Sequence, residues 1–536
     1  MRANPAIMPA MIRFVRFLCL ALLLLLARPV AAQPVEFDAL TVADINAAFD
    51  AGTLTSEQLV QACLARIAAY DRQGPSLHAV MALNPKAVET ARALDAERLA
   101  TGRRSPLHGI PVVLKDNYDT AGLPTTGGSV LLEGWIPPDD AFVVAKLRAA
   151  GAIILAKVNM SEFASASTHS SLGGQSLNPH DLTRSPSGSS GGTGVAIAAA
   201  YAVIGLGTDT GGSIRGPAAF NGIAALKPTH GLLSRDGIIP LALSFDTGGP
   251  LARSVYDVAA ALGVMTGVDA ADEATKKSAG RFETDYTRFL DAAALKGAHI
   301  GIARDFMGED VDVDWVVNAS VDAMRRAGAT VVDVRFPKWM LDAKGEFYTA
   351  IRYPEFVVQI AEYLAATGPA YPKSLAEMIA RAQRFTGTRP DGAGPNPNRW
   401  SLFTRELESG TMADYQYTVA RDHGLPLIRA AVDGVFASQT LDAIVYPTSS
   451  TRPGLIAAPP APGPARAPGT ESASNIANLT GYPDLVVPAG FTSDRLPVTL
   501  SFLGPAFSEG RLLAIGYSFE QATKARRRPV HTPLLR

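Results

Sequence analysis

The sequence predicts an α/β layer fold, and three neighbouring stretches of the chain indicate it. Residues 109–114 form a short apolar run, which predicts a strand that ends at Lys115. Residues 141–150 have the apolar spacing of an amphipathic helix that Gly151 closes, and residues 152–156 are rich in β-forming residues. Because strand, helix and strand follow one another, we expect a sheet covered by helices.

The other elements extend this pattern along the chain. Thr55, with Gln58 three residues later, predicts the capping box of a helix over 55–70. No stretch has the length or monotony of an interdomain linker, so we expect one domain over residues 33–536. The remaining predicted elements are a helix over 41–50, strands over 297–303 and 329–335 around a helix, a largely helical region over 340–430, and Pro/Gly-rich loops over 388–398 and 453–469.

The composition argues against two classes of protein. Of the 536 residues, 47% are hydrophobic, and 49 Lys and Arg nearly balance 50 Asp and Glu. Nucleic-acid-binding proteins carry an excess of positive charge, which this chain lacks, so we expect no nucleic-acid partner. Two cysteines and eight scattered histidines offer no cluster with metal-ligand spacing, so we also expect no metal and no cofactor.

The N-terminus has the order of a secretory signal peptide. Three arginines precede an apolar run of about 11 residues, and small residues follow at 30–32. The run is shorter than the roughly 20 residues that cross a bilayer as a helix. We therefore expect cleavage after residue 32, export to the periplasm or the medium, and no stable membrane insertion of the mature chain. An uncleaved N-terminal anchor is the alternative.

Residues 185–216 are dense in Gly, Ser and Thr, and they predict a loop, a helix, a strand and a second loop. Two such loops can meet at one end of a sheet, where α/β folds bind their ligands. A phosphate-binding loop is disfavoured because no Gly-Lys-Ser/Thr follows the glycines. Residues 188–192 fit Gly-x-Ser-x-Gly, but the stretch before them holds two prolines instead of a strand. A serine nucleophile in the second loop, with a relay from the first, is the third interpretation.

Three segments carry a resemblance to the amidase signature family. They read Ser-Ser-Gly-Gly at 189–192, Thr-Asp-Thr-Gly-Gly-Ser-Ile-Arg at 208–215, and Gly-Ile-Pro-Val-Val-Leu-Lys-Asp-Asn at 109–117. Ser189 and Ser213 are 24 residues apart (213 − 189), which is similar to the family spacing. The resemblance implies a three-layer α/β/α fold with a central mixed β-sheet. Further matching segments lie at 156–163, 220–223, 226–229, 481–488 and 503–504.

The resemblance also implies the catalytic residues, which are Lys115, Ser189 and Ser213. A serine hydroxyl needs a base to become a good nucleophile, and a lysine can be that base when burial keeps it neutral. Lys115 would take a proton from Ser189, and Ser189 would take one from Ser213, as in other Ser–Lys variants of the catalytic triad. The resemblance further implies a cis peptide bond between Gly188 and Ser189.

The backbone N–H groups of Thr210, Gly211 and Gly212, together with that of Ser213, are implied as the oxyanion hole. Asp209 and Arg215 are expected to be structural charges that hold this loop.

Ser190 is left with two interpretations, as a helix N-cap or as a hydrogen-bonding residue of the site. The chain departs from the family pattern at Ser187, where glycine is usual, and at Gly216, where larger residues are common. The histidines near the motifs are disfavoured as bases; these are His108, His169, His180 and His230.

The predicted reaction is acyl transfer to water through an acyl-Ser213 intermediate, with a small-molecule carboxamide as substrate. Carbamates and esters pass through the same kind of intermediate and stay open. Two alternatives are the amidase-like subunit of a tRNA-dependent amidotransferase, which the predicted export opposes, and an inactive binding protein, which the three catalytic side chains oppose. We expect a monomer or a homodimer.

The region over 340–430 is variable in the family and often lines the pocket, although its aromatic residues could equally be core. They are Trp339, just before the region, and Phe347, Tyr348, Tyr353, Phe356, Tyr363 and Tyr371.

Overall fold

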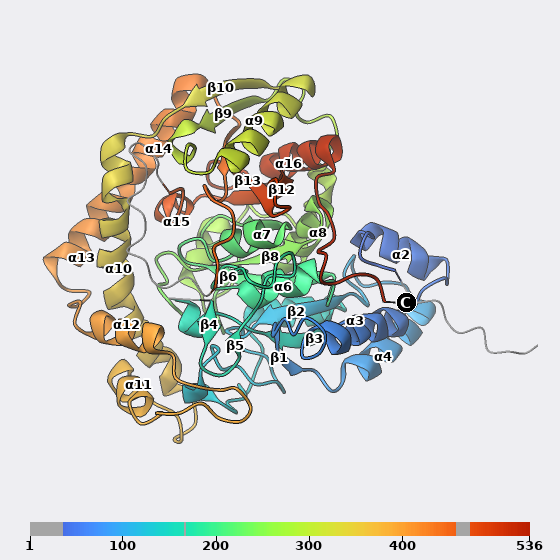
Figure 1. The fold of residues 1–536 in the computed structure, drawn as a ribbon, viewed down its shortest axis with the longest axis vertical. Coiled ribbons are helices and arrows are strands. Elements are labelled where there is room, and N and C mark those ends of the chain that lie inside the picture. The colour runs from blue at the N-terminus through green and yellow to red at the C-terminus, as the bar shows by residue number, and fades with distance from the viewer. Residues whose placement is uncertain (1–35, 166–167, 457–471, 536) are drawn as a thin grey trace, which may run out of the picture. The chain divides into compact units, whose positions relative to one another are not determined.

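A mixed sheet runs through the protein (Figure 1). The computed structural model describes residues 36–165, 168–456 and 472–535, of which residues 37–533 form the unit considered below. The predicted signal peptide, residues 1–32, lies outside the described residues. In their order across the sheet, the strands of the described chain are β1 (Val80–Leu83), β3 (Ile153–Val158), β2 (Pro111–Lys115), β6 (Ile204–Asp209), β8 (Thr247–Ala252), β7 (Ala224–Lys227), β12 (Asp484–Phe491), β13 (Pro497–Leu503), β11 (Ala443–Pro447), β9 (His299–Ala303) and β10 (Thr330–Val334).

Strand directions are mixed in a regular way. β2 is parallel to both β3 and β6, and β9 is parallel to both β10 and β11. The strands between these two groups pair antiparallel. All residues of β2 and β6 are buried, as expected for parallel strands that helices cover on both faces. A separate two-stranded sheet is formed by β4 (His169–Ser170) and β5 (Gly174–Gln175).

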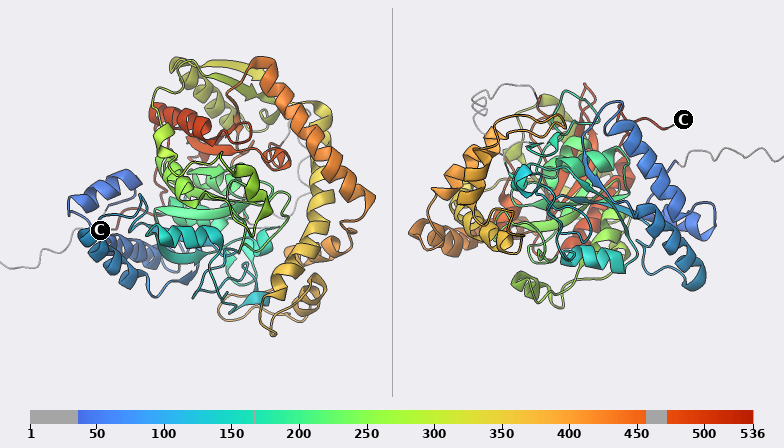
Figure 2. Two further views of the ribbon diagram at one scale, coloured as in Figure 1. Left: turned by 180° about the vertical axis from the view of Figure 1, so that it is seen from behind. Right: turned by 90° about the horizontal axis from the view of Figure 1, so that it is seen from below.

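Helices cover the sheet on both faces, which confirms the predicted three-layer α/β/α architecture. α6 (Gly191–Ala198) and α7 (Arg215–Asn221) lie in front of the strands in Figure 1, and α5 (Phe142–Ala149) and α8 (Val255–Met265) lie in front in the view from behind (Figure 2). The other described helices are α2 (Val42–Asp50), α3 (Ser56–Tyr70), α4 (Ala87–Thr101), α9 (Val311–Arg326), α10 (Lys338–Ala365), α11 (Leu375–Ala382), α12 (Pro397–Leu407), α13 (Tyr415–Val419), α14 (Leu425–Gln439), α15 (Ile476–Thr480) and α16 (Glu509–Thr523).

Local sequence patterns account for several of these elements. Thr55 and Gln58 make both hydrogen bonds of the predicted capping box at the start of α3. β2 ends at Lys115, as predicted, and α9 lies between β9 and β10. The predicted loop over 388–398 runs into α12, whose first residue is Pro397, a residue suited to the first turn of a helix. Most of the predicted loop over 453–469 lies outside the described residues.

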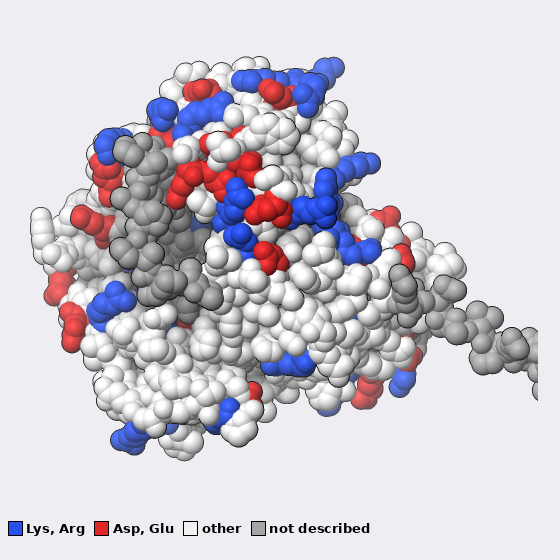
Figure 3. Space-filling view, viewed as in Figure 1, with Lys and Arg blue, Asp and Glu red and all other residues white. Residues whose placement is uncertain are grey.

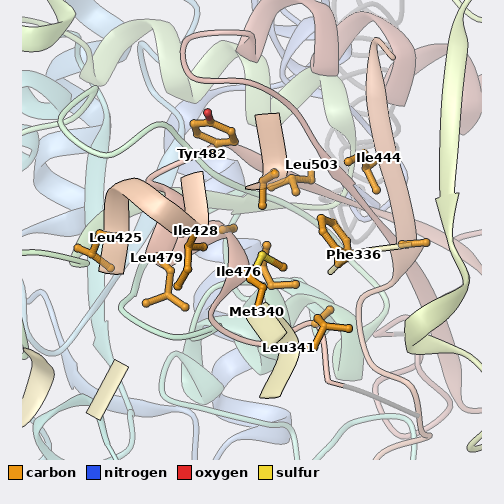
Figure 4. Packing of buried hydrophobic residues seen from close by; sticks show 14 of the residues in the cluster. Phe336, Met340, Leu341, Leu425, Ile428, Ile444, Ile476, Leu479, Tyr482 and Leu503 are labelled. Carbon is orange, nitrogen blue, oxygen red and sulfur yellow. The ribbon is translucent and has the colours of Figure 1, made fainter. Parts of the chain in front are cut away.

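The short helix α15 is held by its apolar side. Ile476 and Leu479 lie among apolar residues of α10, α14, β11 and β13 (Figure 4). Burial of such side chains contributes about 1.5–3 kcal/mol each, so the cluster keeps α15 in place at the end of the sheet. The cluster residues labelled in Figure 4 are Phe336, Met340, Leu341, Leu425, Ile428, Ile444, Ile476, Leu479, Tyr482 and Leu503.

The surface agrees with the balanced composition. On the face shown in Figure 3, acidic and basic side chains alternate over the upper half, and no extended patch of a single sign is visible. Among the described helices, none combines the length and the apolar character needed to cross a membrane.

Candidate active site

The two Gly/Ser-rich loops meet at one edge of the sheet, where β2 and β6 end. These strands are parallel neighbours, so Lys115, the last residue of β2, lies beside the segment 208–213. The other loop leads into α6, and the N–H of Ser190 donates to the carbonyl oxygen of Ser213 over 3.2 Å. The structure therefore brings together the loops that carry Lys115, Ser189 and Ser213.

Lys115 is buried, and its ammonium nitrogen has three oxygen neighbours. Nζ lies 2.7 Å from Ser189 Oγ, 2.7 Å from Thr208 Oγ1 and 3.3 Å from the Thr208 carbonyl oxygen. Thr208 Oγ1 also accepts from Asn117 Nδ2 over 3.0 Å. A neutral amine has two N–H groups and one lone pair, so it can donate to both Thr208 oxygens and accept a proton from the Ser189 hydroxyl.

The surroundings of Lys115 favour its neutral form. Burial lowers the pKa of Lys115 to about 7, and the nearby Asp209 and Asp246 oppose this shift. Because no carboxylate oxygen accepts from Nζ among the described residues, desolvation outweighs the attraction of the negative charges. A substantial fraction of Lys115 is thus unprotonated near neutral pH.

Ser189 and Ser190 are held by backbone contacts. The carbonyl oxygen of Ser189 accepts from the Ser161 N–H over 3.0 Å, and the Gly188–Ser189 peptide bond is cis, as the resemblance implied. Ser190 stands at the N-cap position of α6 but makes no cap hydrogen bond. Its hydroxyl instead donates to the Thr208 carbonyl oxygen over 3.2 Å and accepts from the Thr208 N–H over 3.3 Å, so it joins the two loops.

Asp209 and Arg215 form a buried ion pair on either side of Ser213. Arg215 Nε donates to Asp209 Oδ2 over 3.2 Å, and Asn478 Nδ2 of α15 donates to Asp209 Oδ1 over 2.8 Å. Arg215 Nη1 also donates to Asp484 Oδ2 over 3.1 Å. Burial opposes ionisation of Asp209, yet Arg215 and these hydrogen bonds together hold the pKa of its carboxyl below the ordinary value.

The loop from Asp209 to Ile214 exposes only some of its N–H groups. Gly212 N–H donates to Asp209 Oδ1 over 2.7 Å, and Ile214 N–H donates to Asp209 Oδ2 over 3.0 Å. The N–H groups of Gly211 and Ser213 make no hydrogen bond with any residue that the structure describes. Gly212 has a φ of +120°, a conformation that favours glycine. Of the donors expected for an oxyanion, the Gly212 N–H is thus engaged by Asp209, whereas the N–H groups of Thr210, Gly211 and Ser213 have no hydrogen-bond partner among the described residues.

The side chain of Thr210 binds a second buried carboxyl group, that of Asp246. Thr210 Oγ1 donates to Asp246 Oδ1 over 2.5 Å, and Asp246 Oδ2 accepts from the N–H groups of Leu241 and Ala242 over 2.8 and 3.0 Å. Burial raises the pKa of Asp246 to about 6, although these hydrogen bonds favour the ionised form. Asp246 therefore ties the loop to the turn that precedes β8.

Comparison with known proteins assigns the chain to a family. Residues 58–513 match the family model described as Amidase. The chain belongs to the amidase family. A glutamyl-tRNA(Gln) amidotransferase subunit from Halorhodospira halophila is 37% identical over 488 residues, which are 90% of this chain and 97% of that protein.

Solved structures agree with this assignment. The peptide amidase from Stenotrophomonas maltophilia is 40% identical, with a TM-score of 0.84 over 93% of this chain and 99% of that one. An amidase family protein from Bacillus anthracis is 32% identical, with a TM-score of 0.80 over 92% of each chain. The resemblance to the amidase signature family is confirmed, and the chain is an amidase-type enzyme that acts on C–N bonds.

The two departures from the amidase motif face each other. A Cβ atom built on Gly216 would lie 2.6 Å from Ser187 Oγ, closer than such atoms approach in proteins. Ser187 has a φ of +61°, where glycine is usual. The serine hydroxyl therefore lies in the space that a larger residue at position 216 would need.

Three of the histidines near the motifs contact backbone carbonyl groups instead of the catalytic side chains. Burial lowers the pKa of His180 to about 4 and that of His230 to about 3, and it also lowers the pKa of His169. Among the described residues, no group of three His, Cys, Asp or Glu side chains converges as a metal site would require. The Nε2 atoms of His108, His180 and His230 lie 2.9, 3.2 and 2.9 Å from the backbone carbonyl oxygens of Leu94, Asn221 and Leu243.

Sequence reasoning missed several residues of this site. Asn117 and Thr208 lie inside the matching motifs, next to predicted residues, and could have been found there. Asp484 lies within the matching segment 481–488 and Asn478 lies outside the matching segments, and in both cases only the fold shows the contact with Arg215. Asp246 lies far from the motifs in sequence and reaches Thr210 only through the turn before β8.

The aromatic residues of the 340–430 region have divided roles. Phe356 is fully buried in an apolar cluster of α10, α11 and α12, which is the core interpretation. Tyr363 Oη donates to Asp119 Oδ1 over 2.7 Å, and Trp339 is 43% exposed. Tyr348 lies against Gly211: a Cβ atom built on Gly211 would be 2.8 Å from the Tyr348 hydroxyl oxygen.

Proposed function

We propose that this amidase hydrolyses a carboxamide through an acyl-enzyme on Ser213, with Lys115 as the base and Ser189 as the relay between them. The observation that carries the proposal is the 2.7 Å contact between buried Lys115 Nζ and Ser189 Oγ, next to the half-buried Ser213. A lysine in this position can accept a proton because its pKa is lowered to about 7.

In the first half-reaction, Ser213 Oγ attacks the carbonyl carbon while its proton moves to Ser189 Oγ and the Ser189 proton moves to Lys115 Nζ. The carbonyl π electrons move to oxygen, which the N–H groups of Gly211 and Ser213 stabilise. When the C–N bond breaks, the proton returns from Lys115 through Ser189 to the leaving nitrogen. A primary carboxamide thus yields ammonia and acyl-Ser213.

In the second half-reaction, water attacks the acyl-enzyme and its proton follows the same relay to Lys115. Collapse of the second oxyanion breaks the bond to Ser213 Oγ, which regains its proton. The sum is one carboxamide and one water giving one carboxylic acid and one ammonia. Asp209, Arg215 and Ser190 act as positioning residues, because they hold the two loops and touch neither reacting atom.

The substrate class is supported by the similarity to the peptide amidase, and we propose the terminal carboxamide of an N-acylated amino acid or peptide. The test is a panel of such amides with an anilide, a carbamate and an ester of the same acyl group. We expect ammonia release from the carboxamide and the highest kcat/KM for it, measured by ammonia assay and mass spectrometry. A carbamate or ester turned over at least tenfold faster would contradict this substrate assignment.

The similarity to an amidotransferase component favours a second candidate, a protein that delivers ammonia to a partner. Purification distinguishes the two: a stable heteromeric partner, with amidase activity dependent on it, would favour this candidate. Full activity of the isolated chain would favour the free amidase.

We also propose that the enzyme is exported, because of its N-terminal pattern. Cleavage should leave a mature chain that begins at Gln33. N-terminal sequencing of protein recovered from the periplasm or the medium checks this result. Recovery of a chain that starts at Met1 from the cytoplasm would contradict it.

A further inference from the structure

A cavity of about 430 Å³, a size typical of small-molecule sites, lies beside α15. Lys277 of the 3₁₀ helix η3 (Glu273–Ser278) and Arg429 of α14 bring two positive charges to its lining. Leu425 of α14 and Phe507, just before α16, are among its apolar lining residues. The cavity thus combines a cationic part with an apolar part.

The two positive charges have no carboxylate partner within the part of the chain that the structure describes. Arg429 Nε donates to the Thr480 carbonyl oxygen over 3.1 Å, and neither side chain takes part in an ion pair. Partial burial and the positive charges of Arg429 and Arg235 lower the pKa of Lys277. Cations that approach one another without a counterion destabilise each other's charge, so this arrangement is suited to an anion.

The carboxylates of the adjoining segments are engaged by other groups. Asp272 accepts from Arg235 Nε over 2.8 Å, and Asp433 accepts from the Tyr482 hydroxyl. The attraction of Asp272 raises the pKa of Lys277 by less than either arginine lowers it. The cationic part of the cavity therefore keeps its positive charge available for a ligand.

The apolar part of the cavity is formed by residues of the protein core. Leu425, Leu479 and Tyr482 line the cavity, belong to the cluster of Figure 4 and are at most 9% exposed. The Arg281 guanidinium lies 5.0 Å from the centre of the Phe507 ring. A carboxylate on a hydrocarbon body matches both parts, because guanidinium and ammonium groups bind carboxylate oxygens and the hydrocarbon covers the apolar wall. Inorganic phosphate would leave that wall uncovered.

We propose that this cavity is a second ligand site, in which Lys277 and Arg429 bind an organic carboxylate. None of the three proposed catalytic residues lines it. Asn478, which does line it, donates to Asp209 of the nucleophile loop over 2.8 Å, so α15 connects the two sites. The acid that the proposed reaction releases is one member of this ligand class, but the cavity does not depend on that reaction.

Isothermal titration calorimetry with 3-phenylpropanoate tests the site. Ser213 is first labelled with a fluorophosphonate probe, so that the catalytic pocket is occupied. We expect saturable binding, and Lys277→Gln and Arg429→Gln should each raise Kd at least about tenfold, because each removes a charge-assisted hydrogen bond. The uncharged 3-phenylpropan-1-ol and inorganic phosphate should both bind at least about tenfold more weakly than the acid. Both variants alter surface side chains, so an unchanged melting temperature shows that they are folded.

Lys276→Gln is the matched control, because Lys276 is the neighbouring lysine, pairs with Glu273 and does not line the cavity. It should leave Kd within about twofold of wild type. Absence of binding, equal affinity of wild type and both variants, or equal affinity for acid and alcohol overturns the site. Tighter binding of phosphate than of the acid overturns the ligand class. If Ser213 takes no label, the proposed function fails, and the same titration on unlabelled protein still tests the cavity.

Discussion

Replacing Ser213 with alanine is expected to lower kcat by at least about 10⁴-fold, because the variant lacks the oxygen that would carry the acyl group. Ser213 is half-buried in a turn, so the change removes one hydroxyl and no core contact. The free energy of unfolding should therefore change by less than about 1 kcal/mol. Steady-state kinetics and urea unfolding measure these two results, and intact-mass analysis after treatment with a fluorophosphonate probe should show no label on the variant.

Ser187→Gly is the control for this experiment. Ser187 lies in the first loop with a φ of +61°, so glycine fits its backbone, and its hydroxyl has no proposed role in the reaction. This variant should keep activity within about tenfold of wild type and should still be labelled by the probe. Appreciable turnover by a folded Ser213→Ala protein, or its labelling at another serine, would show that the nucleophile is misassigned.

The pH dependence tests the role of Lys115. Its lowered pKa, about 7, predicts that kcat/KM rises roughly tenfold per pH unit below pH 7, because the protonated amine cannot accept a proton. Above pH 7 the rate should level off, since most of Lys115 is then neutral. The measurement is a kcat/KM profile from pH 5 to pH 10. A profile that falls across neutral pH as the pH rises would contradict a lysine base.

Substitutions at Lys115 should have an effect second only to those at Ser213. Lys115→Ala should lose at least about 10³-fold in kcat/KM, and Lys115→Arg should be no better, because a guanidinium stays protonated. Ser189→Ala should lose less, since a water molecule can replace a relay hydroxyl but not a base. The controls are four single variants, in which glutamine replaces one histidine at a time: His108→Gln, His169→Gln, His180→Gln and His230→Gln. A folded histidine variant as inactive as Lys115→Ala would rule out the lysine relay.

The same pKa makes a prediction about stability. Between pH 7 and pH 10 the unfolded chain keeps Lys115 protonated, whereas the folded protein holds it neutral, so folding releases a proton. The contribution of Lys115 to the free energy of unfolding therefore rises with pH in this window. Lys115→Met lacks this dependence, so the free energy of unfolding of wild type should gain several kcal/mol relative to that of the variant from pH 7 to pH 10. A constant difference would contradict the lowered pKa.

Much of the fold could be predicted because its signals are local. The capping box at Thr55 and Gln58 depends on neighbouring hydrogen bonds, and α3 begins where the box indicates. β2 ends at Lys115 because the apolar run that forms the buried strand ends there. The order of the eleven strands in the described sheet could not be predicted in the same way. Pairing β12 with β7 depends on segments more than 200 residues apart, and no local pattern records such a pairing.

In the candidate site, too, some features have a local sequence signal and others depend on the tertiary structure. The resemblance to the amidase signature family implied Lys115, Ser189 and Ser213, and the two glycine-rich loops around one helix–strand unit predicted that their serines meet at one edge of the sheet. It could not decide the role of Ser190, whose hydroxyl serves the Thr208 backbone instead of the helix that it precedes. Nor could it indicate that Gly212 N–H donates to Asp209, since a glycine-rich loop in sequence does not reveal which way each amide points.

The sequence by itself determined the family and the layered α/β architecture, because each depends on local patterns of residue types, and the resemblance to the family implied the three side chains proposed for the chemistry. Only the tertiary structure decided the pKa values and the surroundings of those side chains. Complete burial lowers the pKa of Lys115, and burial is a property of everything that packs around a residue. The placement of Tyr348 and Asn475 against Gly211 was decided in the same way, since α10 and α15 reach this loop only when the apolar cluster between them has formed.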